Sequence, residues 1–68
     1  MNYKKIGPQF RSLDDSRLAT PSPHPFQESS YCVYYVLPSG RECMKAPFRS
    51  LKAAAQWAKG YVSDPANA

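Results

Sequence analysis

The chain has 68 residues, which is room for one domain and excludes a second. A domain of this size buries only about 60% of the surface that its unfolded chain exposes, so we do not expect a deep ligand pocket beside the core. Nine basic residues oppose five acidic ones, and the net charge of +4 favours partners with negative surfaces, such as nucleic acids or acidic proteins.

The first part of the chain, residues 1–30, is predicted to be irregular. Residues 2–6 are compatible with a short strand, which the glycine and proline that follow it break. Residues 10–19 predict one or two helical turns, because a serine and an aspartate three residues apart have the spacing of an N-terminal capping box. Residues 20–26 carry prolines on alternate positions and predict an extended, polyproline-like path.

The strongest strand signal follows. Residues 31–37 are rich in aromatic and β-branched side chains and predict a strand. Residues 38–41 predict a turn, in which Gly40 can take the positive φ that a hairpin needs. Residues 42–46 predict the returning strand. Pro47 is expected to end it, because proline cannot donate a hydrogen bond to the ladder.

An amphipathic helix is predicted over residues 51–62, with Ser50 as its N-cap. Pro65 is expected to prevent its continuation, and the tail after it to be frayed. Trp57 lies at the edge of the apolar face. That face comprises Leu51, Ala54, Ala55, Ala58, Tyr61 and Val62.

The hairpin register follows from its tip. If Ser39 and Gly40 form the tip, Tyr34 lies opposite Lys45, and alternation assigns every side chain to a face. The face expected against the helix comprises Tyr31, Val33, Tyr35, Leu37, Met44 and Ala46. The face expected outward comprises Cys32, Tyr34, Val36, Cys43 and Lys45.

Together these elements predict a small α+β fold, in which an antiparallel hairpin or three-stranded sheet packs against one C-terminal helix. Residues 31–68 form the predicted ββα module, which is too short to be stable alone. Residues 1–30 are therefore expected to pack on it within the same domain. Residues 3–6 are expected to add a third strand, or the prolines to cover Trp57 and Tyr61; a homodimer is the remaining alternative.

Catalysis and metal binding have no support in the sequence. His24 sits between prolines in an extended stretch, and a solvated linker histidine explains it. The carboxylates of Asp14 and Asp15 are adjacent and diverge. Cys32, Cys43 and His24 provide three potential ligands at most, where a structural zinc site wants four. We therefore expect no enzyme activity, no cofactor, no metal and no small-molecule substrate.

A cytoplasmic location is expected. No stretch resembles a secretory signal, and no apolar run is long enough to cross a bilayer, so we expect no membrane contact. Two cysteines are too few for a disulfide scaffold, and in the cytosol their thiols would stay reduced.

The remaining signal is a surface that mixes basic and aromatic side chains. Tyrosine beside lysine on an open sheet face is one way in which proteins stack bases and neutralise phosphates. An ordinary solvated helix face explains the helix lysines equally well. The predicted macromolecule-binding residues are Tyr34, Arg41, Lys45, Arg49 and Lys52.

The first functional hypothesis is a non-enzymatic accessory or regulatory protein, of the inhibitor or adaptor type, that binds and modulates a larger macromolecular assembly. Tyrosine and arginine, both common here, are frequent interface anchors. Chains of this size and profile are frequent in phages and other mobile elements. The alternative is a nucleic-acid-binding protein that uses the outer sheet face.

Overall fold

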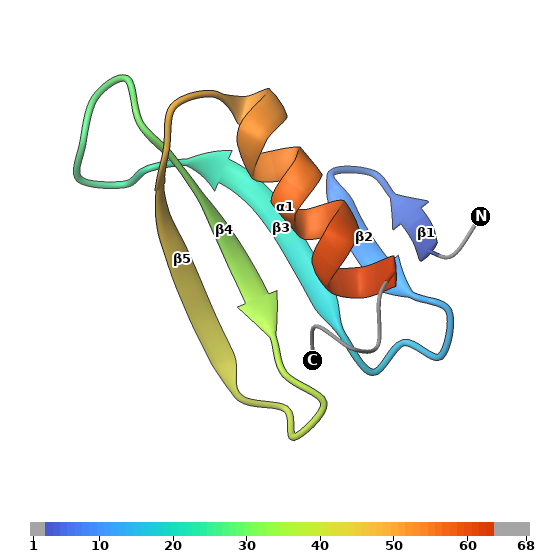
Figure 1. Ribbon diagram of the computed structural model, residues 1–68. Helices are drawn as coiled ribbons and strands as arrows, with labels where there is room; N and C mark the ends of the chain where they lie inside the picture. The colour runs from blue at the N-terminus through green and yellow to red at the C-terminus, as the bar shows by residue number, and fades with distance from the viewer. Residues whose placement is uncertain (1–2, 64–68) are drawn as a thin grey trace.

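The computed structural model describes residues 3–63 and arranges them in two layers, a sheet and a helix (Figure 1). The sheet is antiparallel with strand order β1-β2-β3-β4-β5, so each strand pairs with its neighbours in the sequence. The predicted α+β class and the C-terminal helix are confirmed, but the sheet has five strands, not two or three. The elements are β1 (Tyr3–Ile6), β2 (Gln9–Ser12), β3 (Leu18–Pro23), β4 (Tyr31–Val36), β5 (Glu42–Phe48) and α1 (Leu51–Ser63).

The N-terminal part supplies three of the five strands. The prediction of an irregular segment over residues 1–30 is therefore wrong for residues 3–23. The short strand expected at residues 2–6 is confirmed as β1, although residue 2 lies outside the described part of the chain. Gly7 takes a φ of 60°, which lets the chain reverse so tightly that Ile6 pairs with Gln9.

A hairpin loop replaces the helical turns expected over residues 10–19. The Ser12 hydroxyl accepts a hydrogen bond from the Arg17 N–H at 2.9 Å and donates one to the Asp14 carboxylate at 2.8 Å. The Asp15 N–H donates to the Ser12 carbonyl at 3.0 Å, and Asp15 takes a φ of 61°. The serine–aspartate spacing of a capping box therefore serves a turn, because both residues also bond their own backbone in loops.

Within the proline-rich stretch, residues 20–23 belong to a strand, so the polyproline-like path expected over residues 20–26 is wrong for that part. β3 pairs with β4 along its whole length, including Pro21 and Pro23. Backbone nitrogens of successive residues in a strand face opposite sides. Because the His24 N–H faces β4, the nitrogens of Pro21 and Pro23, which carry no hydrogen, face away from β4. On that side β2 pairs with β3 only through Leu18 and Ala19, so no ladder hydrogen bond is lost. The His24 N–H continues the pairing by donating toward the β4 side.

The β4–β5 hairpin has a three-residue tip. The Leu37 N–H donates to the Arg41 carbonyl at 2.9 Å, and the Gly40 N–H donates to the Leu37 carbonyl at 2.8 Å. Gly40 takes a φ of 91°, which an L side chain rarely adopts. Tyr34 consequently pairs with Met44, one residue away from the expected partner. The predicted register is wrong, because a longer tip moves every later pairing.

A shift of one residue exchanges the two faces of a strand. The prediction that Met44 and Ala46 face the helix is therefore wrong, and both are exposed. Cys43 and Lys45 lie opposite Tyr35 and Val33 and share the helix side with them, contrary to the prediction. The placement of Tyr31, Val33, Tyr35 and Leu37 against the core is confirmed. β5 also continues through Pro47, past a register shift, to Phe48.

The helix matches its prediction. α1 ends at Ser63, and the Ser50 hydroxyl accepts a hydrogen bond from the Ala53 N–H at 3.1 Å as an N-cap. Pro65, the expected stop, lies outside the described residues. Leu51 was expected on the buried face but is 49% exposed. The core comprises Phe10, Ala19, Val33, Ala54, Ala58, Tyr61 and Val62.

Aromatic rings fill the space where α1 passes over β4. Trp57 stacks on Tyr61 with ring centroids 5.4 Å apart, and Tyr35 meets both rings edge-on. Arg17, also buried, donates to the Tyr61 carbonyl at 3.1 Å in the last turns of α1, where a cation is favourable. These contacts fix the helix to the central strands.

The Asp14 carboxylate gives stability a pH dependence. Hydrogen bonds from Ser16 and Ser12 lower its pKa from 3.8 to about 2. Because the pKa of Asp14 is lower in the folded state, its ionised carboxylate stabilises the fold at pH values above 3.8. This stabilisation is lost as the pH falls from 3.8 through about 2. We expect Asp14→Asn to flatten the decline in urea midpoint on acidification through this range, and Glu28→Gln, an exposed control, to leave it unchanged. An unaltered decline in Asp14→Asn would contradict this assignment.

Candidate functional site

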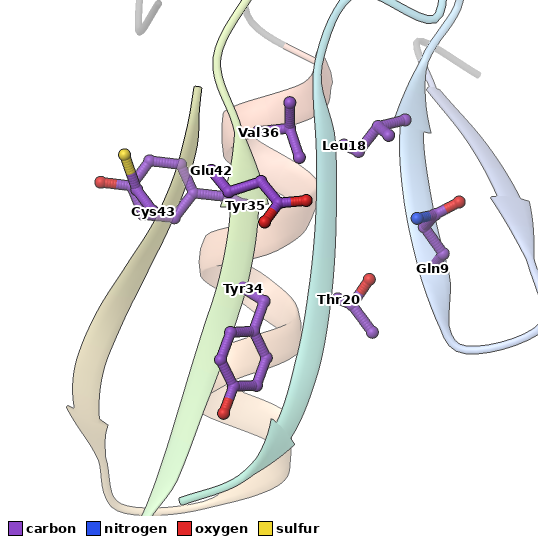
Figure 2. Close-up of a pocket in the computed structure, with 8 residues that line it drawn as sticks. All are labelled: Gln9, Leu18, Thr20, Tyr34, Tyr35, Val36, Glu42 and Cys43. Carbon is purple, nitrogen blue, oxygen red and sulfur yellow. The ribbon is translucent and has the colours of Figure 1, made fainter. Parts of the chain in front are cut away.

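One face of the sheet is left without a helix. α1 packs on one side, and in the described residues no helix covers the other, which faces the viewer in Figure 2. Alternation along the paired strands decides which side chains belong to it. We call this surface the open face. Its residues are Lys4, Ile6, Gln9, Arg11, Leu18, Thr20, Ser22, Cys32, Tyr34, Val36, Glu42 and Met44.

Tyr34 and Met44 form an exposed pair toward the β5 edge of the open face. They are cross-strand partners, so their Cβ atoms are neighbours, and they are 44% and 45% exposed. Leu18 and Val36 form the adjacent pair and are half-buried. The interaction with Cys32 and partial burial raise the pKa of the Tyr34 hydroxyl. The open face therefore presents a tyrosine and a methionine beside a shallow aliphatic surface.

A pocket of about 290 Å³ opens beside Tyr34 (Figure 2). Its size is at the lower end of the range for ligand pockets, and an amide, a hydroxyl and a carboxylate lie among its aliphatic walls. Those dimensions suit a single side chain of a bound partner. The lining residues are Gln9, Leu18, Thr20, Tyr34, Tyr35, Val36, Glu42 and Cys43.

The charges of the open face are largely offset. Lys4 forms an ion pair with Asp15 at 2.9 Å, and Arg11 lies 3.8 Å from the same carboxylate. The Arg11 Nε also donates to the Gln9 amide oxygen at 2.8 Å. Glu42 adds a negative charge at the other side. The face is therefore close to neutral, which differs from the basic character of the whole chain.

The structure separates the five predicted site residues. Tyr34 lies on the open face, whereas Lys45 lies on the helix side with its ammonium 5.9 Å from the centre of the Trp57 ring. The predicted pairing of Tyr34 with Lys45 on one face is therefore wrong. Arg41 lies opposite Leu37 at the hairpin tip, two residues before Cys43, so alternation along the chain places it on the side of Lys45.

Four of the predicted residues form a second surface. Arg41 directly precedes β5, Lys45 lies within it, and Arg49 follows it, while Lys52 lies in the first turn of α1. All four side chains are exposed. We call this surface the basic row. The first turn of α1 carries no acidic residue, so the positive end of the helix dipole adds to the same charge.

Sequence reasoning missed most of the open face. Gln9, Leu18 and Thr20 belong to strands that were predicted as helical turns or as polyproline, and Met44 was placed on the wrong side. One available signal was the run of two aspartates and a serine over residues 14–16, which is typical of a turn between two strands.

Neither thiol belongs to a metal site in the described residues. Within residues 3–63 no group of three or more histidine, cysteine or acidic side chains is placed to hold a metal ion. Cys32 is buried and its thiol lies 3.8 Å from the Pro23 carbonyl, whereas Cys43 is half-buried on the helix side. Both are free, and they lie on opposite faces, contrary to the predicted shared face.

The described part of the chain holds no helix of the length and apolarity that a membrane span requires. No known protein-family model matches the sequence, and no curated protein or solved structure gives a significant match to it. The functional conclusions therefore depend on the two surfaces alone.

The register of β5 can be tested by truncation. Met44→Ala should change the free energy of unfolding by no more than about 0.5 kcal/mol, because the side chain is exposed. Val33→Ala should cost about 2 kcal/mol, because that side chain is fully buried beneath α1. Urea denaturation of the two variants measures both values. Equal losses would place Met44 in the core and contradict the observed pairing.

Proposed function

We propose that this protein is a non-enzymatic accessory or regulatory protein, of the inhibitor or adaptor type, that docks on a larger protein assembly through the open face. The observation that carries the proposal is the exposure of Tyr34 and Met44, side by side, on a sheet face that α1 does not cover. Aromatic residues and methionine are enriched at protein interfaces, and tyrosine is a frequent hot spot.

The surroundings of this pair support the same function. An interface core is typically apolar and its rim polar. Here Leu18 and Val36 adjoin the Tyr34–Met44 pair and extend its apolar surface inward, and Lys4, Arg11 and Glu42 lie at the edges of this surface. The adjacent pocket would receive one side chain of the partner. Its carboxylate, from Glu42, favours a donor at the tip of that side chain.

A base-stacking platform on this face has less support. Such a platform needs unpaired cations near its aromatic rings. Lys45 lies on the opposite side, and both cations of the open face share the Asp15 carboxylate. The proposed partner of the open face is therefore a protein whose contacting surface is apolar and close to neutral. We propose that the two proteins meet in the cytoplasm.

The test compares partner capture by three forms of the protein. The first is the wild type, and the second is the double variant Tyr34→Ser/Met44→Ser. The third is Leu51→Ser, a matched control that removes an equally exposed apolar side chain from the start of α1. We expect one protein to be retained by the wild type and by the control and lost by the double variant. With that protein purified, the double variant should weaken the Kd by about thirtyfold or more, the scale of a hot spot.

Two outcomes would contradict the proposal. The first is equal capture by all three forms, which would show that the open face takes no part. The second is a homodimer in analytical ultracentrifugation that only the double variant dissociates, since a second copy would then occupy the face. Circular dichroism of each form checks that the fold is intact.

A further inference from the structure

The basic row is a second surface, which the proposed docking function does not use. We propose that Arg41, Lys45, Arg49 and Lys52 bind the phosphate backbone of nucleic acid. The inference goes beyond the docking function, because Lys45 lies on the helix side of β5 and the other three residues lie at the ends of β5 and the start of α1, whereas Tyr34 and Met44 belong to the open face.

The row is regularly spaced. Arg41 directly precedes β5 and Lys45 lies within it, and the four residues between their positions correspond to about 13 Å at the rise of an extended chain. Arg49 follows four residues later, just before the N-cap of α1, and Lys52 lies within the first helical turn. The cations therefore form an extended line, from the hairpin tip to the start of the helix, rather than a compact cluster.

No carboxylate neutralises this line within the described residues. The ion pairs in residues 3–63 belong to the N-terminal hairpin, where Lys4 and Arg11 meet Asp15. Glu42, the acidic residue of β5, points to the open face. Lys45 contacts the face of the Trp57 ring, which holds its long side chain over the surface without removing its charge.

The composition of the row favours a phosphate backbone over a protein. A protein interface needs an apolar core with anchoring side chains. The neighbouring Trp57 ring is engaged by Tyr61, Tyr35 and Lys45, so it is not a free anchor. Phosphate contacts need only cations in sequence along the backbone, and they position the protein without reading bases. The expected binding is therefore independent of nucleotide sequence.

The experiment measures fluorescence anisotropy of a labelled oligothymidylate, and of a labelled duplex, over a range of salt concentrations. The test variant is Arg41→Gln/Lys45→Gln/Arg49→Gln. The matched control, Lys4→Gln/Lys5→Gln/Lys59→Gln, removes the same charge outside the row. For the single strand, each lost phosphate contact should reduce the slope of log K against log salt by about 0.7, so the test variant should lose about 2. The control should keep most of the wild-type slope.

Each result decides the proposal. A slope reduced only in the test variant supports it. Equal reductions in the two triple variants would show that net charge, not the row, drives binding, and would overturn it. Absence of wild-type binding to both probes at low salt would also overturn it. The three single substitutions, all at exposed positions, give the same comparison if the triple variant is unfolded. Tyr34→Ser/Met44→Ser should bind both labelled oligonucleotides like the wild type, so this experiment tests the basic row independently of the docking proposal.

Discussion

One helix can cover only one face of a five-stranded sheet, and the rest of this structure follows from that limit. α1 has 13 residues, about 20 Å of helix, and it sits on the central strands. Ala54 and Ala58 are fully buried and bring the helix backbone close to β3 and β4. The chain has no second helix in its described part, so the opposite face keeps its side chains in solvent.

The polar contacts of the structure serve this single packing layer. The Tyr61 hydroxyl donates to the Val36 carbonyl at 2.8 Å, at the edge where the helix leaves the sheet. The buried guanidinium of Arg17 bonds the carbonyl of the same tyrosine. An aromatic residue thus links β4, the β2–β3 hairpin and the end of α1. Burial raises the pKa of Tyr61, which keeps its hydroxyl protonated as a donor.

The sheet also divides the chemistry of the surface. The open face is aromatic, aliphatic and close to neutral, because its cations share Asp15. The helix side of β5 keeps its cations without carboxylate partners in the described residues. Four of the nine basic residues of the chain therefore belong to the basic row. The protein partner and the polyanion that we propose would therefore contact different surfaces, as in an adaptor.

The sequence by itself determined the local elements whose signals are strong: α1 with its Ser50 cap, the β4 strand and the hairpin turn at Gly40. It also determined that Arg41, Lys45, Arg49 and Lys52 are exposed cations. Only the tertiary structure decided the secondary structure of residues 9–23, because prolines and loop-forming serines are compatible with a strand once a neighbouring strand pairs with one of its edges. It alone decided which face each β5 side chain takes. One additional residue in the hairpin tip, set by the Leu37–Arg41 hydrogen bond, moved Met44 outward and Lys45 to the helix side.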